Sequence, residues 1–145
     1  MTVSQLLVHK GHDVFTVNSS QTVYQALQIL AEKNIGALVV LEEKKPVGMF
    51  SERDYARRVM LKGASSLETR VKEVMSYHLV SVGPDTGIES ALGVMSRKRI
   101  RHLPVIAEGK LVGLVSIGDL VEALLHQKDR EIARLKRTAP STTPD

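Results

Sequence analysis

Residues 47–54 of the chain have the sequence Val47-Gly48-Met49-Phe50-Ser51-Glu52-Arg53-Asp54, and a similar stretch follows 65 positions later as Val112-Gly113-Leu114-Val115-Ser116-Ile117-Gly118-Asp119. The offset of 65 continues without a gap through most of each half, where Val17 matches Val82. Nearer the N-terminus the offset becomes 68, so that Val3 matches Val71. A match of this length indicates two copies of one supersecondary unit.

Each copy is predicted to have the order β-α-β-β-α, because period-2 and helical apolar spacings alternate along it. The predicted strands are 14–17, 37–41 and the run into residue 51, then 79–82, 103–106 and the run into residue 116, and the predicted helices are 22–33, 53–61, 87–98 and 118–136. We expect an α/β (α+β) fold in which the copies pack together, since neither has enough apolar surface to fold alone.

The expected division places the first copy, with a linker from residue 62, in residues 1–69 and the second copy, with its long last helix, in residues 70–137. The composition of residues 138–145 predicts a disordered tail.

The composition of the 145 residues excludes several classes of protein. A hydrophobic content of 43% is too high for a disordered chain, and the absence of cysteine excludes disulfides and thiolate zinc sites. Aromatic residues make up only 3%, which argues against a stacking platform for single-stranded nucleic acid. No apolar run approaches the ~20 residues of a membrane span, and no signal peptide is apparent, so a soluble cytoplasmic protein is expected. The net charge of +4 suggests an anionic partner.

The Gly-x-x-Ser-x-x-Asp motif stands at a strand-to-helix junction in both copies. A glycine there lets backbone or ligand approach closely. Ser51 and Ser116 fall at the N-cap, where a hydroxyl and free backbone N–H groups suit a phosphate oxygen. Asp54 and Asp119 follow one turn later, as acceptors for the two hydroxyls of a ribose. The pattern therefore offers both recognition elements of a nucleotide.

The same residues also form an ordinary capping box, in which serine and aspartate only stabilise the helix start. Duplication would copy a cap as readily as a binding site. The neighbouring cations favour the nucleotide interpretation: Arg53 lies inside the first motif, and basic residues cluster at 97–102 in the second copy. A guanidinium at a strand entry suits phosphate better than it suits a core.

The two motifs, together with Ile100-Arg101-His102-Leu103-Pro104-Val105, resemble a tandem pair of CBS domains, a Bateman module. The resemblance covers roughly residues 3–125 and is greatest to small bacterial proteins that consist of the pair alone. It implies two repeats packed through their sheets with pseudo-twofold symmetry, leaving two clefts. It also implies a non-catalytic regulatory module, an energy or ligand sensor that binds AMP, ADP, ATP, NAD or S-adenosylmethionine and forms a homodimer.

In such modules the motif aspartate contacts ribose, the motif serine contacts phosphate, and strand entries line the base. The positions that the resemblance assigns to ligand binding are Thr16, Val17, Gly36, Ala37, Ser51, Arg53, Asp54, Ser81, Arg101, His102, Pro104, Ser116, Ile117 and Asp119. The clefts are not expected to be equivalent, because the first copy lacks the Arg-His-x-Pro run and the second has Gly118 where the first has Arg53. Small residues favour Ser116 and Asp119, with Thr16, Gly36 and Ala37, as the better adenosine site.

Three other interpretations stay open. His9 and His12 could be half a metal site, although solvent-facing loop residues are the simpler interpretation and no metal site is predicted. An enzyme ranks last, since His102 has no companion nucleophile and no catalytic residue is assigned. The alternative function is an interaction module with degenerate clefts, whose basic stretch 128–136 binds a protein or, less favoured, a nucleic acid. An apolar stripe on the last helix suggests a dimer or partner contact; it comprises Leu120, Val121, Leu124, Leu125, Ile132 and Leu135.

Overall fold

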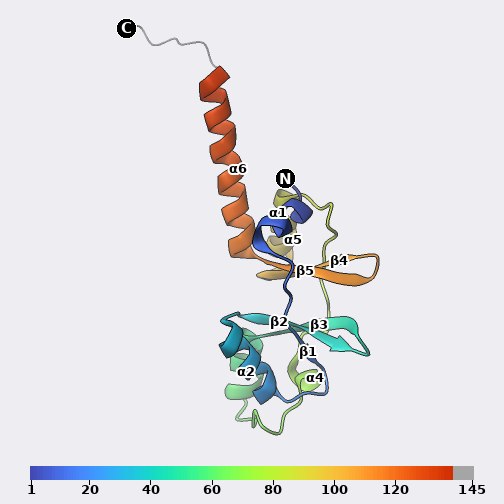
Figure 1. Ribbon diagram of the computed structural model, residues 1–145. Helices are drawn as coiled ribbons and strands as arrows, with labels where there is room; N and C mark the ends of the chain where they lie inside the picture. Colours follow the sequence, from blue (N-terminus) through green and yellow to red (C-terminus); the bar gives the residue numbers. More distant parts are fainter. Residues whose placement is uncertain (139–145) are drawn as a thin grey trace.

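Two separate β-sheets form the centre of the molecule, one above the other in Figure 1. The computed structural model describes residues 1–138. The first sheet has the order β1-β2-β3, with β1 parallel to β2 and β2 antiparallel to β3, and the second is the antiparallel pair β4-β5. The strands are β1 (Thr16–Asn18), β2 (Ala37–Glu42), β3 (Lys45–Ser51), β4 (His102–Ala107) and β5 (Lys110–Ser116). The predicted α+β class is confirmed.

Helices cover the outer face of each sheet. They are α1 (Val3–Lys10), α2 (Val23–Lys33), α3 (Glu52–Tyr55), the π-helical turn η1 (Ala56–Met60), α4 (Val71–Val74), α5 (Ile88–Lys98) and α6 (Ile117–Thr138). Thr22 begins α2 with a capping box, and the left-handed residues Asn34 and Arg99 end α2 and α5 at equivalent positions of the two copies. The helix predicted for 53–61 is divided, because α3 gives way to the π-helical turn.

The short helices that precede each copy are exchanged between the two cores. Val3, Leu6 and Leu7 of α1 are buried in the core of the second copy. Val71 and Val74 of α4 are buried in the core of the first copy. The sequence did not predict these two helices as elements. Each core therefore takes one helix from the chain that precedes the other copy's sheet, which ties the two copies together.

Backbone hydrogen bonds attach the exchanged helices in the same way on both sides. Val3 N donates to Thr86 O over 2.8 Å, and its counterpart Val71 N donates to Gln21 O over 2.9 Å. An isolated antiparallel bridge joins Thr2 to Gly87, and an equivalent bridge joins Thr22 to Arg70. This reciprocal pattern agrees with pseudo-twofold packing of the two repeats.

The strand predicted at 79–82 is not formed, and this prediction was wrong. Only Val82 pairs there, through one parallel bridge to Val105. In the first copy β1 is longer, and Ser19 N just beyond it donates to Leu41 O over 3.0 Å. The position equivalent to Ser19 is Pro84, which has no N–H to donate, so the pairing cannot extend.

The predicted tail also needs one correction at its first residue. Thr138 belongs to α6, which continues the long last helix of the second copy to that point. The remaining tail residues, 139–145, lie outside the described residues.

Candidate functional site

Both copies of the repeated motif form a hydrogen-bonded cap at the start of a helix. Ser51 N and Ser51 Oγ donate to Asp54 Oδ2 over 2.9 and 3.0 Å, and Asp54 N donates to Ser51 Oγ over 3.2 Å. In the second copy Ser116 N donates to Asp119 Oδ2 over 2.8 Å, and Asp119 N donates to Ser116 Oγ over 3.1 Å. The capping box is thus real at both sites, and it holds each carboxylate beside its serine.

The two aspartates differ in what lies next to them. Ser76 Oγ donates to Asp54 Oδ1 over 3.4 Å, so this carboxylate has neutral hydroxyl neighbours. Lys10 Nζ lies 2.9 Å from Asp119 Oδ2 and also donates to the Leu114 carbonyl. Lys10 is the last residue of the exchanged helix α1, which explains how a residue of the first copy reaches the motif of the second. The Asp119 site therefore has an ammonium group that the Asp54 site lacks.

The ammonium changes the protonation of the groups around it. Partial burial of the Asp119 carboxyl acts to raise its pKa, but the Ser116 backbone hydrogen bond and Lys10 outweigh this and hold the pKa below its ordinary value. Burial lowers the pKa of His102, and the charges of Lys10 and Arg101 lower it further against the opposing effect of Asp119. Asp119 is accordingly an anionic acceptor and His102 a neutral imidazole at pH 7.

The strand entries of the two copies face each other at this site. A Cβ added to Gly36 would lie 3.9 Å from His102 Cε1 and 3.8 Å from Glu52 Oε1. His102 in turn is close enough to Lys10 and Asp119 for their charges to shift its pKa. Gly36 thus packs close to the neutral His102 ring, and even a methyl group at this position would be in van der Waals contact with it.

The other predicted site residues lie in varied surroundings. Val17, Ala37 and Pro104 are buried in strands, and Thr16 is half-buried beside them. Side chains at the remaining positions are exposed: Arg53, Ser81, Arg101 and Ile117. Within residues 1–138, no hydrogen bond or ion pair joins Ser81 or Arg53 to Asp54. The predicted contact of Arg53 with a ligand phosphate stays a prediction.

The motif glycines accommodate the protein's own chain. A Cβ on Gly48 would lie 2.3 Å from Ser76 O, and one on Gly113 would lie 2.7 Å from Leu7 Cδ1. Met49 and Ser76 exchange backbone hydrogen bonds of 3.0 and 2.9 Å at this contact. Of the two roles that the sequence suggests for these glycines, the close approach of another chain segment is the one the structure contains.

Sequence reasoning missed Lys10 and Ser76 as neighbours of the two aspartates. Lys10 lies among residues 9–12, where the first copy has its three extra residues, and that insertion was the available signal. Both histidines are exposed, as expected for solvent-facing residues, but His9 lies in α1 and not in a loop. His12 lies in the loop, where its Nδ1 is 3.2 Å from Val112 O. Across the described part of the chain, no three His, Asp or Glu side chains converge as a metal site.

Two repeats of this topology, each with a capped Ser-x-x-Asp junction, define a tandem pair of one domain, and the CBS domain family model matches residues 3–61 and 71–126. The chain belongs to the CBS-domain family. CBS domains are generally regulatory, non-catalytic modules. A curated relative, the mitochondrial CBS domain-containing protein CBSX3 of Arabidopsis thaliana, is 36% identical over 92% of this chain and 69% of that protein.

Solved structures agree with this assignment. A protein with CBS domains from Burkholderia ambifaria superposes with a TM-score of 0.83 at 42% identity, over 87% of this chain and 95% of its own. The CBS domain pair of protein MJ0100, in complex with 5′-methylthioadenosine and S-adenosyl-L-methionine, gives a TM-score of 0.76 over 86% of this chain and 99% of its own. Its 22% identity shows a shared fold alone. No helix within residues 1–138 is both long and apolar enough to cross a bilayer.

Proposed function

We propose that the chain is a regulatory module that binds an adenosine nucleotide of the AMP, ADP, ATP or NAD type in the cleft beside Asp119. The carrying observation is the arrangement at this site: an anionic carboxylate fixed by Ser116, with Lys10 at 2.9 Å. The carboxylate suits the ribose hydroxyls, and the serine hydroxyl, helix start and ammonium suit phosphate. The surface where Gly36 approaches the His102 ring suits the base.

The choice of Asp119 over Asp54 follows from charge. Asp54 is surrounded by the hydroxyls of Ser51 and Ser76, and no ion pair to it is formed within residues 1–138. A nucleotide phosphate near Asp54 would meet the aspartate's negative charge with no ammonium to offset it. Adenosine ligands bound to a structural neighbour, MJ0100, support an adenosine compound as the ligand class here.

A thermal-shift series with AMP, ADP, ATP, NAD and S-adenosylmethionine tests the proposal. A ligand that binds only the folded protein stabilises it by about 2.7 kcal/mol at a hundredfold excess over its Kd. We expect a concentration-dependent rise in Tm for at least one of these compounds. The rise should disappear in Asp119→Ala, when each variant is compared with its own unliganded Tm.

Asp54→Ala is the matched control, because it removes the equivalent carboxylate and cap from the other copy. It should lower the basal stability and keep the ligand shift. The proposal fails if no adenosine compound raises the Tm, or if the shift survives in Asp119→Ala and disappears in Asp54→Ala.

We further propose that two copies associate through the exposed apolar face of α6. Val121, Leu125 and Ile132 follow one another at spacings of four and seven, which places them on one face, and their exposed fractions are 43%, 61% and 51%. Leu120 of the predicted stripe is instead buried in the core of the second copy. Sedimentation should show a dimer that Leu125→Glu dissociates and Ala133→Glu does not; a monomeric wild type would refute it.

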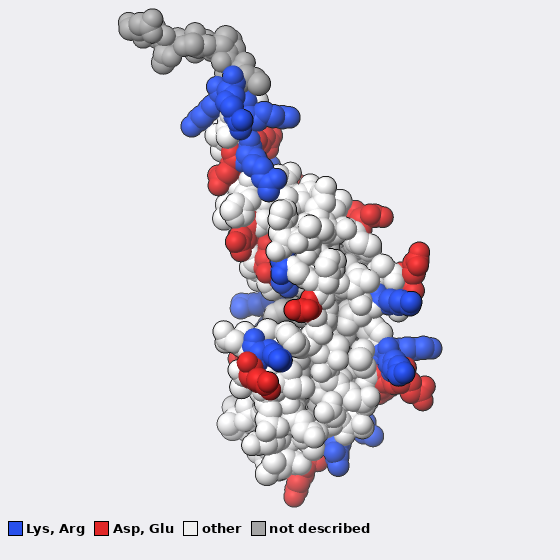
Figure 2. Space-filling model, viewed as in Figure 1, with Lys and Arg blue, Asp and Glu red and all other residues white. Residues whose placement is uncertain are grey.

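The alternative function is an interaction module that uses the basic end of α6. Figure 2 shows Lys and Arg side chains gathered on the part of α6 that projects from the body. The basic residues of this segment are Lys128, Arg130, Arg134, Lys136 and Arg137. An anionic macromolecular partner would then bind with an affinity that falls steeply as the salt concentration rises. Asp119→Ala would leave this affinity unchanged. A nucleotide-dependent Tm rise that Asp119→Ala abolishes would contradict the degenerate cleft that this alternative assumes.

A further inference from the structure

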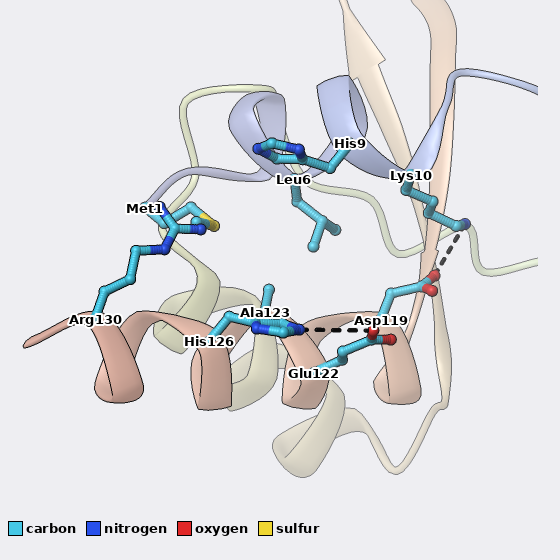
Figure 3. A pocket seen from close by; sticks show the side chains of 9 residues that line it. All are labelled: Met1, Leu6, His9, Lys10, Asp119, Glu122, Ala123, His126 and Arg130. Carbon is cyan, nitrogen blue, oxygen red and sulfur yellow. Dashed lines mark ion pairs between the residues drawn. The ribbon is translucent and has the colours of Figure 1, made fainter. Parts of the chain in front are cut away.

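A groove of about 390 Å³ runs between α1 and α6 and begins at Asp119 (Figure 3). Its floor includes the side chains of Leu6 and Ala123, which belong to the core of the second copy. Its walls carry nitrogen-bearing side chains from both helices: His9 and Lys10 from α1, and His126 and Arg130 from α6. The groove thus continues outward from the proposed ribose acceptor.

The α6 members lie on one face of the helix. His126 and Arg130 follow Asp119 by seven and eleven positions, which is about two and three turns, and the rise of 1.5 Å per residue places Arg130 about 16 Å along the axis. An extended ligand is therefore needed to span the row from Asp119 to Arg130. Nitrogen-bearing side chains therefore follow one another along this wall of the groove.

Two carboxylates also face the groove, and each has a partner. Asp119 is paired with Lys10 at 2.9 Å, and Glu122 Oε1 lies 3.8 Å from His126 Nε2. Arg130 supplies the guanidinium group among the residues that line the groove. Within the described residues this guanidinium forms no ion pair. A ribose that donates its two hydroxyls to Asp119 would compete with Lys10 for this carboxylate and leave the ammonium available to a phosphate.

We propose that this α1–α6 groove receives the phosphate chain of the nucleotide whose ribose is held at Asp119, so that the site favours nucleotides with two or more phosphates over a monophosphate. The inference rests on the proposed function and names its ligand class. Lys10 binds the first phosphates, and Arg130, with His126 beside it, binds the far end. Both contacts are charge-assisted, the kind of hydrogen bond that distinguishes a longer anion from a shorter one.

Isothermal titration of the full chain with AMP, ADP and ATP, at one ionic strength and in EDTA, tests the proposal. One additional charge-assisted contact corresponds to about a tenfold change in affinity. We expect ATP to bind about tenfold or more tightly than AMP. Arg130→Gln should remove most of this difference by weakening ATP and should leave the affinity for AMP unchanged.

Lys128→Gln is the matched control, because it removes one positive charge from the same stretch of α6 outside the groove, where Lys128 lies 3.8 Å from Glu89. It should keep the preference for ATP. Equal affinities for AMP and ATP would overturn this inference and leave the proposed function standing, whereas no binding of either would overturn both. If Lys128→Gln and Arg130→Gln lose the preference for ATP equally, the preference arises from the long-range charge of α6. That result would also overturn the proposed role of the groove.

Discussion

Gly48→Ala is predicted to destabilise the protein strongly, because the added methyl meets backbone. Its carbon would lie 2.3 Å from Ser76 O and 3.3 Å from Ser76 C, while ordinary contacts begin at 3.4 Å. The carbonyl would have to move by about 1 Å. That carbonyl accepts from Met49 N at 3.0 Å, and Ser76 N donates back to Met49 O at 2.9 Å, so the shift strains both bonds.

The expected cost combines those two bonds with the overpacking. Two backbone hydrogen bonds at about 1 kcal/mol each, with about 1–3 kcal/mol for overpacking, predict a loss of about 3–5 kcal/mol in the free energy of unfolding. Urea denaturation followed by circular dichroism measures this loss of stability. Circular dichroism is chosen because the chain has no tryptophan for a fluorescence signal. Gly113→Ala should cost less, because its methyl meets the end of the Leu7 side chain and not backbone.

Gly83→Ala is the control, since a methyl at position 83 would have nothing within 4 Å. It should change the stability by less than about 0.5 kcal/mol. The reasoning is refuted if Gly48→Ala is as stable as Gly83→Ala. A stable Gly48→Ala that had lost ligand binding would instead mean that the glycine serves ligand access.

Three further predictions concern single side chains. Lys44→Gly should raise the unfolding free energy by about 1 kcal/mol, because φ is 67° at this position, and an unchanged urea midpoint would contradict it. Lys10→Met should raise the pKa of Asp119 in an NMR titration of the carboxyl carbon. Since that pKa lies below 3.8 in the folded chain, the stability that Asp119 contributes is present above pH 3.8 and is lost as the pH falls through the lowered value. Asp119→Asn should lack this acid dependence of the stability. Arg58→Ala should cost about 1–2 kcal/mol in urea denaturation, because its guanidinium donates over 3.1 and 2.9 Å to two carbonyls at the end of α4, and an equal cost for Arg57→Ala would contradict the assignment.

The failures of prediction follow from the range of the interactions involved. The strand predicted near Val82 does not form because Pro84 lacks the N–H that would extend the pairing with β4. The apolar pattern of residues 79–82 does not show this, since the missing donor matters only once the segment lies beside β4. Helix α4 is only four residues long, too short for periodicity to mark it, and it is stabilised by burial in the first core. Arg58 similarly donates to the carbonyl of Met75 at the end of α4, and the local helical pattern around Arg58 does not predict this contact.

The sequence by itself determined the duplication, the order of the main elements and the capped Ser-x-x-Asp junctions, because caps and periodicity depend on residues within a few positions of one another. Tertiary structure alone decided that α1 and α4 exchange cores, and with that exchange, which aspartate has a cation beside it. Lys10 and Asp119 are more than a hundred positions apart, and no local rule pairs them. They meet because burial of Leu7 against Gly113 fixes α1 on the second copy, so that the ammonium at the end of this helix reaches the carboxylate.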